Sequence, residues 1–503
     1  NVESRGLGDV YKRQICIWWI NSRSNIQKNC KLFSTRRINL KNLNLDYLKS
    51  LDIDYSKVVN HTFDVVEGSI LCINHEDNNK LNEYISSSLN ENPKFVITSN
   101  KCDIQDEKVL IFEDYENVFN YILERISPNY KSLNYFGITG TNGKTTTAFY
   151  LNQLIGSDNL FIGTIDEKQK YSFTNEKILT TPKLFNVVKL ISLQQENISS
   201  VSLEVSSHAL DQNRLGDLKF LVSGFTNLSQ DHLDYHGSIE NYLNSKAKLF
   251  QKGVSEKFVY IDSPESSQIV SASNIESFSI GTNDYNDVRY KEIDEQILKF
   301  TIDSNQVECQ INLSGPKFIE NFLLAFSMAY YSNLFELEDL IHKSQYVVNP
   351  PGRFETINRN NKTVIIDYAH TPGAIKEAIK YAQNKYEKVN VILGAGGDRD
   401  KGKRMKMGEA SSNADYVIIT NDNPRNEDPL EISKNILEGI PLNKSSDVIL
   451  DRKEAIHKGV QLLKENEVLL VLGKGHEKYQ EIDNKFIPFD DVQITKEIME
   501  LEN

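Results

Sequence analysis

Short apolar runs, each bounded by polar or glycine-rich residues, alternate with longer stretches of helical periodicity along most of the chain. Residues 135–139, 201–204 and 221–226 are such runs in the middle of the sequence. Runs of this length that are rich in β-branched and aromatic residues predict strands. Their alternation with helical patterns predicts βαβ units around a parallel sheet, and so an α/β fold.

A second series of apolar runs follows the junction Asn-Pro-Pro-Gly at 349–352. Each of its four runs ends in a polar, acidic or Gly-rich loop: 363–367, 389–393, 416–420 and 468–472. Open parallel sheets bind ligands at the carboxyl ends of their strands. The pattern therefore predicts a second, Rossmann-like sheet with a binding site formed by these loops.

The residues before 133 are rich in Asn, Lys, Ser and Asp, with strand-like runs at 69–73 and 94–98 that predict a small α/β domain. The stretch 1–14 is polar and patternless, and we interpret 1–30 as a non-native or disordered extension. A chain of 503 residues is long enough for about three domains. We expect an N-terminal domain at 31–132, a central domain at 133–348 and a C-terminal domain at 349–503.

The composition narrows the class of protein. A net charge of −13 disfavours general binding of nucleic acid, which needs a basic face. The five cysteines are scattered without a CxxC pair, so neither a zinc site nor a disulfide framework is predicted, and a cytoplasmic setting fits best. No apolar run approaches the roughly 18 residues of a membrane span. We expect a cytoplasmic monomer without membrane insertion.

The first run in the middle of the sequence leads into Gly140-Thr-Asn-Gly-Lys-Thr-Thr-Thr147, followed by a helical pattern. A strand, a Gly-rich loop and Lys-Thr at the start of a helix form a phosphate-binding loop, whose backbone N–H groups surround phosphate oxygens. Lys144 would contact the β and γ phosphates of ATP, and the Thr145 hydroxyl would bind Mg²⁺. The usual spacing is altered, because Ile138 stands where the first Gly belongs.

Glu204 ends the run 201–204 and is expected near this loop. A carboxylate at that place can hold Mg²⁺ against the γ phosphate.

The segment TGTNGKTT at 139–146 resembles the phosphate loop of the Mur ligases, which build the peptidoglycan stem peptide, and of the related folylpolyglutamate synthases. The resemblance implies an ATP-dependent ligase in which a carboxylate attacks the γ phosphate and an amine then attacks the acyl phosphate. It also implies that His232, in TNLSQDHLDYHG, is a second metal ligand. Lys246 matches a lysine that becomes a metal-binding carboxylate when carbamylated.

Three further matches imply ATP contacts. Asn321 lies in GPKFIEN, where Phe318 replaces the Asn of the family's adenine-contacting segment, and the resemblance assigns Arg353 to phosphate and Asp367 to ribose. The complete set of ATP-binding residues implied is Gly140, Thr141, Asn142, Gly143, Lys144, Thr145, Thr146, Asn321, Arg353 and Asp367.

Three charged loops follow predicted strands of the C-terminal sheet: GGDRDKGKR at 396–404, DNPR at 422–425 and GKGHE at 473–477. A zwitterionic amino acid needs such a mixture of cations and acids. The loops resemble those of the Mur ligases that add meso-diaminopimelate. The Arg425 guanidinium could bind the distal carboxylate of that amino acid, which lysine lacks. The residues implied for this pocket are Arg399, Asp422, Asn423, Arg425, Gly473 and Glu477.

The second substrate implied by the resemblance is UDP-N-acetylmuramoyl-L-Ala-D-Glu. Contacts to it are implied for Thr62, Thr180, Thr181, Ser206, Gln212 and Arg214. The N-terminal domain departs most from the family here. Its uridine motif DSRxVxxG is replaced by HTFDVVEG at 61–68, so Phe63 stands in place of an Arg.

Three alternatives remain. A ligase of the same branch could add lysine, against which the DNPR sequence argues. A folylpolyglutamate synthase does not suit the combination of DYAHTP at 367–372, GGDRD and GKGHE. A catalytically impaired nucleotide-binding homologue is suggested by the altered N-terminal motif and by Phe318, and would bind ATP without turning it over.

Overall fold

The computed structural model describes residues 42–165, 172–175, 179–194, 198–294 and 296–501. The extension expected at 1–30 lies outside these residues. Contacts divide the described chain into two compact units, one of residues 42–126 and 173–175, the other of the remaining described residues.

The first unit is a small α/β fold around a four-stranded parallel sheet, in the order β1-β2-β3-β4. Its strands are β1 (Val58–Val59), β2 (Ile70–Cys72), β3 (Phe95–Ser99) and β4 (Val109–Phe112). Its helices are α2 (Leu45–Lys49), η1 (Tyr55–Lys57), η2 (Thr62–Asp64), α3 (Asn78–Leu89) and α4 (Tyr115–Ile126). The strands predicted at 69–73 and 94–98 are confirmed as β2 and β3.

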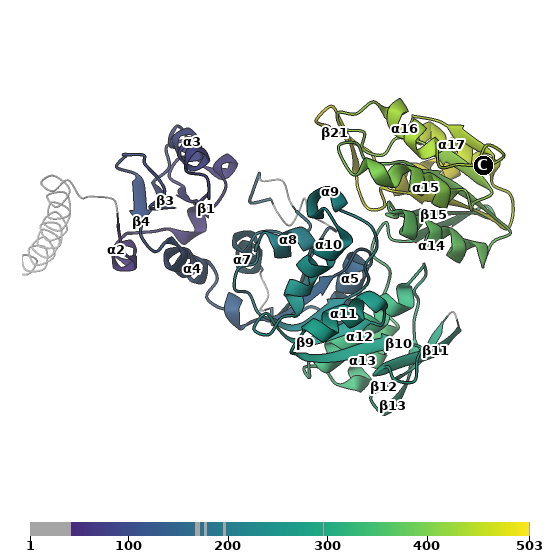
Figure 1. The fold of residues 1–503 in the computed structure, drawn as a ribbon, viewed down its shortest axis with the longest axis horizontal. Coiled ribbons are helices and arrows are strands. Elements are labelled where there is room, and N and C mark those ends of the chain that lie inside the picture. The colour runs from purple at the N-terminus through teal and green to yellow at the C-terminus, as the bar shows by residue number, and fades with distance from the viewer. Residues whose placement is uncertain (1–41, 166–171, 176–178, 195–197, 295, 502–503) are drawn as a thin grey trace, which may run out of the picture. The chain divides into compact units, whose positions relative to one another are not determined.

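The second unit begins with a nine-stranded sheet in the order β13-β12-β11-β10-β9-β8-β5-β7-β6. Figure 1 labels its strands β9 to β13. Its strands are β5 (Asn134–Thr139), β6 (Asn159–Ile162), β7 (Ser200–Glu204), β8 (Phe220–Phe225), β9 (Ser255–Ile261), β10 (Glu276–Gly281), β11 (Val288–Asp294), β12 (Ile297–Ile302) and β13 (Asn305–Gln310). Strands β5 to β11 pair in parallel, as predicted. The edge formed by β12 and β13 is antiparallel, which the sequence patterns did not indicate.

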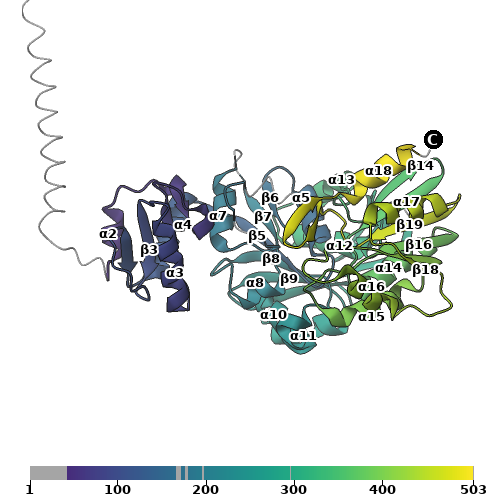
Figure 2. The same cartoon turned by 90° about the horizontal axis from the view of Figure 1, so that it is seen from above.

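Helices cover both faces of this sheet (Figure 2). The helices of this part of the chain are η3 (Tyr130–Ser132), α5 (Lys144–Ile155), α7 (Leu184–Ser192), α8 (Ser207–Asp211), α9 (Leu233–His236), α10 (Ile239–Ala247), η4 (Lys248–Phe250), α11 (Pro264–Ala272), α12 (Phe318–Tyr331) and α13 (Leu337–Ser344). On one face α5 and α12 share the main apolar core, where the ring of Tyr150 meets that of Phe322 edge-on. On the other face Phe250 packs against Phe225 and Phe258.

The C-terminal part of the second unit is a six-stranded sheet in the order β14-β15-β19-β16-β17-β18, parallel except for β14. Its strands are β14 (Glu355–Arg359), β15 (Lys362–Asp367), β16 (Lys388–Leu393), β17 (Tyr416–Ile419), β18 (Ser446–Val448) and β19 (Glu467–Leu472). The four predicted strands are confirmed as β15, β16, β17 and β19. The predicted domain boundaries at 133 and 349 stay predictions, although sheets begin just after each.

The C-terminal sheet has an apolar core on each face, which gives three layers (Figure 2). Its helices are α14 (Pro372–Gln383), η5 (Lys401–Lys403), α15 (Arg404–Ser411), α16 (Pro429–Leu437), α17 (Arg452–Leu462) and α18 (Asp491–Leu501), and β20 (Tyr479–Ile482) with β21 (Lys485–Pro488) forms a hairpin. Helix α14 begins at Pro372 because of its neighbouring residues. The Thr371 side chain accepts a hydrogen bond from the Ala374 N–H, and Pro372 occupies the first turn.

Within the described ranges, none of the helices combines the length and the apolar character needed to cross a membrane.

Candidate active site

A cavity of about 910 Å³ lies within the second unit, where loops at the carboxyl ends of strands from both of its large sheets come together. Most of the residues predicted from the sequence line it: Thr141, Asn142, Gly143, Lys144, Thr145, Thr146, Thr180, Glu204, Ser206, Arg214, His232, Asn321, Arg353, Asp367, Arg399, Asp422, Asn423, Arg425, Gly473 and Glu477. Gly140, Thr181, Gln212 and Lys246 are not among the residues that line it. Thr62 lies in η2 of the first unit.

The phosphate loop connects β5 to α5, as its sequence predicts. Gly143 has φ +85°, and a Cβ at this position would collide with the side chain of Asn321. Only glycine accepts both the left-handed backbone and the close approach. The half-buried Lys144 curls back over the loop, where its Nζ donates hydrogen bonds to the carbonyl oxygens of Gly140 (2.9 Å) and Thr141 (2.8 Å). Burial lowers the pKa of Lys144, against the opposing charges of nearby carboxylates.

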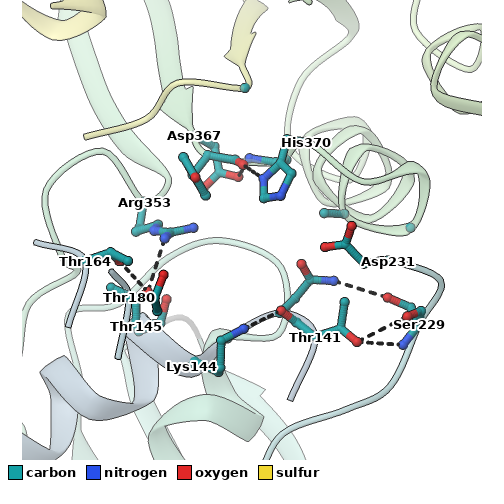
Figure 3. A pocket seen from close by; sticks show the side chains of 18 of the residues that line it. Thr141, Lys144, Thr145, Thr164, Thr180, Ser229, Asp231, Arg353, Asp367 and His370 are labelled. Atoms are coloured by element: carbon teal, nitrogen blue, oxygen red, sulfur yellow. Dashed lines mark hydrogen bonds between the residues drawn. The ribbon is translucent and has the colours of Figure 1, made fainter. Parts of the chain in front are cut away.

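The side chains of Thr145 and Glu204 meet at the start of α5, where Figure 3 labels Thr145 and Thr164. The Thr145 hydroxyl donates to Glu204 Oε2 at 2.9 Å, and the Thr164 N–H donates to Glu204 Oε1 at 2.9 Å. Among the described residues, no three His, Cys, Asp or Glu side chains gather closely enough to hold a metal ion by themselves. Nevertheless, hydroxyl and carboxylate oxygens beside a phosphate loop are the donors that Mg²⁺ prefers, with phosphate and water completing its shell. The residues present therefore fit this ion.

Lys246 is buried in α10, behind the phosphate loop. Its Nζ donates to the carbonyl oxygen of Gly140 at 2.8 Å and lies 4.2 Å from the centre of the Tyr242 ring. Burial lowers the pKa of Lys246 well below its ordinary value, and the charge of Lys144 adds to this effect. A lowered pKa favours the uncharged amine, which is the form that reacts with CO₂.

His232 and its neighbour Asp231 lie on the cavity wall. His232 Nε2 is 3.5 Å from one carboxylate oxygen of Asp231, and Lys403 Nζ is 3.7 Å from the other. Burial by itself raises the pKa of Asp231, but the charges of Lys403 and His232 outweigh burial and lower this pKa to about 2. Asp231 therefore joins a loop of the central sheet to η5 of the C-terminal sheet.

The buried His236 has a structural role. Its Nε2 lies 3.0 Å from the Ser207 hydroxyl, and its Nδ1 lies 3.3 Å from the Ser245 hydroxyl. Both ring nitrogens are thus engaged, and the imidazole ties α8, α9 and α10 together. His208 lies against the same cluster, with its ring centre 4.2 Å from that of Tyr235 and 4.9 Å from that of His232.

Arg353 and Asp367 face the phosphate loop from the C-terminal side (Figure 3). Arg353 stacks on the ring of Tyr368 at 4.3 Å and donates from Nη2 to the Thr145 hydroxyl at 3.2 Å. Its buried Nε has no hydrogen-bond partner among the described residues, which suits the arrival of an anion such as phosphate. The Asp367 carboxylate accepts from the N–H groups of Phe354 (2.8 Å) and Ala369 (2.8 Å), so it also shapes its own loop.

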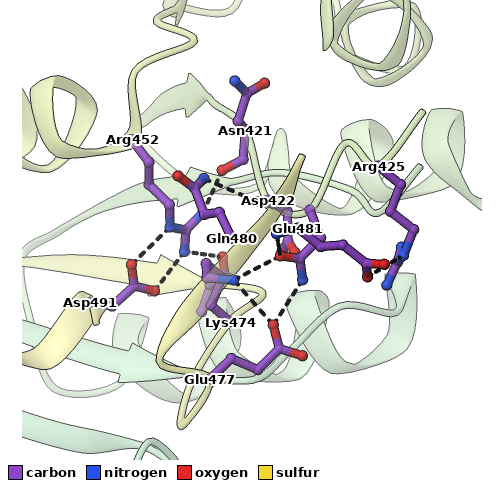
Figure 4. A network of polar contacts seen from close by, with 11 residues as sticks. Asn421, Asp422, Arg425, Arg452, Lys474, Glu477, Gln480, Glu481 and Asp491 are labelled. Atoms are coloured by element: carbon purple, nitrogen blue, oxygen red, sulfur yellow. Dashed lines mark hydrogen bonds and ion pairs between the residues drawn. The ribbon is translucent and has the colours of Figure 1, made fainter. Parts of the chain in front are cut away.

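A network of acids and cations occupies the loops of the C-terminal sheet (Figure 4). The fully buried Lys474 donates to Glu477 (3.1 Å) and to Asn423 Oδ1 (3.2 Å), and Asn423 donates to Glu477 at 2.8 Å. Arg425 is held on the other side, since its Nε donates to Glu481 at 2.8 Å. Arg399 is exposed and makes no hydrogen bond or ion pair with any residue that the structure describes.

The residues expected to contact the peptidyl sugar divide into two groups. Thr181 is fully buried, and its hydroxyl donates to the carbonyl of Glu204 (2.8 Å) and accepts from the N–H of Ser206 (2.8 Å). It therefore supports the wall rather than lining it. Arg214 lines the cavity and donates from Nη1 to the Thr181 carbonyl (3.1 Å) and from Nε to Gln212 (2.9 Å).

Sequence reasoning missed several residues of this site. Asp231 and Lys474 stand inside motifs that were recognised, but only the fold shows that they hold their neighbours. Glu481 follows the GKGHE loop at a point where a charged hairpin residue is usually solvated. Thr164 follows an unremarkable strand, and the sequence around it carries no signal that would have found it.

Comparisons with known proteins agree with this geometry. Residues 138–329 match the Mur ligase middle domain, and residues 352–475 match the Mur ligase glutamate ligase domain. The UDP-N-acetylmuramoyl-L-alanyl-D-glutamate–2,6-diaminopimelate ligase of Rickettsia bellii (strain RML369-C) is 37% identical over 82% of this chain and 90% of the relative. The ligase of the same name from Aquifex aeolicus (strain VF5) is 38% identical over 73% of this chain and 77% of the relative.

Solved structures show the same fold. A structure of UDP-N-acetylmuramoyl-L-alanyl-D-glutamate–2,6-diaminopimelate ligase covers 92% of this chain and 99% of its own, with a TM-score of 0.59 at 26% identity. The MurF ligase from Thermotoga maritima in complex with ADP covers 90% of this chain and 99% of its own, with a TM-score of 0.61 at 16% identity. The resemblance first seen in the phosphate loop extends over most of the sequence and of the fold, and the chain belongs to the Mur ligase family.

Proposed function

We propose that this chain catalyses the ATP-dependent addition of meso-2,6-diaminopimelate to the D-Glu of UDP-N-acetylmuramoyl-L-Ala-D-Glu in peptidoglycan synthesis. The observation that carries the proposal is the single cavity that a phosphate loop and three mixed-charge loops line together. A ligase of this kind must bring nucleotide phosphates and an amino acid to the same carboxylate. The names of the relatives that match most of the chain support the same reaction.

In the first step, a carboxylate oxygen of D-Glu attacks the γ phosphorus of ATP. The bond between that phosphorus and the bridging oxygen breaks, which leaves ADP and an acyl phosphate. Lys144, the loop N–H groups and Arg353 would neutralise and orient the phosphates, which is most of what phosphoryl transfer requires. Mg²⁺ would be held by Thr145 and Glu204, together with His232 and carbamylated Lys246 by family resemblance, and would supply further charge neutralisation.

In the second step, an amino group of diaminopimelate attacks the acyl carbon. A tetrahedral oxyanion forms, inorganic phosphate leaves, and the amine loses a proton. Nearby cations stabilise such an oxyanion. Arg425 and Arg399 would receive carboxylates of the amino acid, and Glu477 and Asp422 its distal ammonium group. A guanidinium suits a carboxylate because it can donate two parallel hydrogen bonds to it.

For the remaining residues, Asn321 would contact adenine, Asp367 the ribose, and Thr180, Ser206 and Arg214 the peptidyl sugar. Thr62 would contribute to uridine binding from the first unit. We expect the protein to act in the cytoplasm as a monomer. Among the described residues, Cys72 and Cys309 are buried thiols outside any disulfide.

The test is phosphate release by the purified protein with ATP, Mg²⁺ and UDP-N-acetylmuramoyl-L-Ala-D-Glu, in the presence of meso-diaminopimelate or of L-lysine. Turnover that needs diaminopimelate is the expected result. Turnover with lysine would keep the chemistry and overturn the assigned amino acid. ATP binding without turnover would instead support the catalytically impaired homologue.

A further inference from the structure

The hairpin of β20 and β21 pairs with the DNPR loop. The Arg425 N–H donates to the carbonyl oxygen of Glu481 at 2.9 Å, and Arg425 forms a parallel β-bridge with Ile482. Arg425 has φ +53°, a left-handed conformation that is uncommon for a residue with a side chain. The backbone of the hairpin thus holds this turn in place.

Glu481 also holds the side chain of Arg425. The Arg425 Nε donates to Glu481 Oε2 at 2.8 Å, while its Nη1 donates to the Gly397 carbonyl oxygen at 2.7 Å. The third nitrogen, Nη2, makes no hydrogen bond with any described residue. Both side chains are largely buried, at 17% and 12% exposure, and both line the cavity. The guanidinium is therefore fixed by two of its nitrogens and has its third available to a ligand.

Glu481 also contacts the rest of the proposed amino acid pocket. The Glu481 N–H donates at 2.9 Å to Asn423 Oδ1, the atom that also accepts from Lys474. Through this contact Glu481 stands between Arg425 and the cluster of Asn423, Lys474 and Glu477. A change in its carboxylate would alter Arg425 directly, while the main-chain contacts could persist.

We propose that Glu481 is a positioning residue that sets the preference for an amino acid with a second carboxylate. It does so by holding the Arg425 guanidinium in one orientation before the ligand arrives. An arginine that is already ordered loses less conformational freedom when it bonds a carboxylate, so it binds that group more tightly. The inference deepens the proposed function and rests on it, because it takes diaminopimelate as the amino acid.

The experiment compares two variants of Glu481 with a control on the same hairpin. Glu481→Leu removes the carboxylate, and Glu481→Gln keeps an oxygen that can accept from Nε. The control is Asp483→Asn, because Asp483 is exposed and Asn tolerates its φ of +47°. The Michaelis constants for diaminopimelate, ATP and the UDP-linked substrate are measured for each variant, together with kcat and the melting temperature.

We expect Glu481→Leu to raise the KM for diaminopimelate by about tenfold or more, since a hydrogen bond to a charged group is lost. Glu481→Gln should show a smaller rise, and Asp483→Asn none. The KM values for ATP and the UDP-linked substrate should stay within about twofold. If Glu481 acts through Arg425, adding Glu481→Leu to Arg425→Ala should raise the diaminopimelate KM no further.

Three results would overturn the inference. One is an unchanged diaminopimelate KM in Glu481→Leu, and another is an equal rise in all three KM values, which would indicate a structural role only. The third is a full effect of Glu481→Leu in the Arg425→Ala background. A wild-type protein without diaminopimelate-dependent turnover would overturn the proposed function as well, whereas normal wild-type turnover beside any of these results would overturn the inference alone.

Discussion

The side-chain amine of Lys246 donates a hydrogen bond of 2.8 Å to the backbone carbonyl of Gly140, so that α10 supports the turn that opens the phosphate loop. The two residues are 106 positions apart in the chain. A buried amine in this place has both a structural contact and a lowered pKa, and these properties lead to the first prediction.

We expect the stability of the wild type to rise with pH relative to that of Lys246→Met. Below pH 10.5, the ordinary lysine pKa, unfolded Lys246 is protonated, whereas folded Lys246 begins to lose its proton at a lower pH. Because the unfolded state then binds more protons, stability increases with pH between the two pKa values, by about 1.36 kcal/mol per unit of difference. Urea unfolding in CO₂-free buffer at several pH values measures this.

The control for that comparison is Lys248→Met. Lys248 lies two residues further on and is 44% exposed, paired with Asp211 on the surface. Its replacement should give a stability difference that changes little over the same pH range. A flat pH dependence for Lys246→Met as well would show that the buried amine stays protonated.

Glu204→Gln should weaken the binding of Mg²⁺ and leave the folding of the protein largely unchanged. The amide oxygen can still accept from the Thr164 N–H, and the amide NH₂ can donate to the Thr145 hydroxyl, but the charge that would hold the ion is gone. We expect the Mg²⁺ concentration for half-maximal rate to rise by about tenfold or more, which corresponds to a loss of about 1.4 kcal/mol in ion binding. Titration of phosphate release with Mg²⁺ tests this. The exposed Glu338→Gln serves as control, and equal Mg²⁺ curves for both variants would contradict the assignment.

Arg425→Ala should raise the KM for diaminopimelate far more than the KM for ATP. The expected rise is about 10- to 100-fold, since an arginine bonded to a carboxylate contributes on the order of 1.5–3 kcal/mol. Steady-state kinetics with each substrate varied in turn measures the two constants. Arg425→Lys is informative beside it, because an ammonium group keeps the charge but not the fork of donors. Similar changes in both KM values would contradict the assignment of Arg425 to the amino acid pocket.

Arg452 and Asp491 form a fully buried pair that joins α17 to α18, with contacts of 2.8 and 2.7 Å. Arg452→Met should lower the free energy of unfolding by about 3–5 kcal/mol, because Asp491 would remain buried without a partner. Urea unfolding measures the loss. The double variant Arg452→Met, Asp491→Leu should recover most of it, and a double variant as unstable as the single one would show that packing rather than charge is at fault.

The parts of this protein that the sequence alone determined are local in the chain. The strands of the C-terminal sheet, the phosphate loop and the start of α5 each depend on neighbouring residues, through apolar runs, glycine and Lys-Thr spacing. The loops at the ends of these strands were expected to share one edge, because the carboxyl ends of parallel strands lie together. The motifs also placed the chain in the family that the comparisons confirm.

Only the tertiary structure decided which side chains contact one another. The contact of Lys246 with Gly140, the bridge from Asp231 to Lys403 and the grip of Glu481 on Arg425 join residues far apart in the chain. The side-chain pattern of β12 and β13 also left their antiparallel pairing open, since short runs carry no information on their partners. Burial and hydrogen-bond geometry arise only when separate segments pack. For that reason they make His236, which lies between the hydroxyls of Ser207 and Ser245, a structural residue and make Glu481 of the hairpin part of the site.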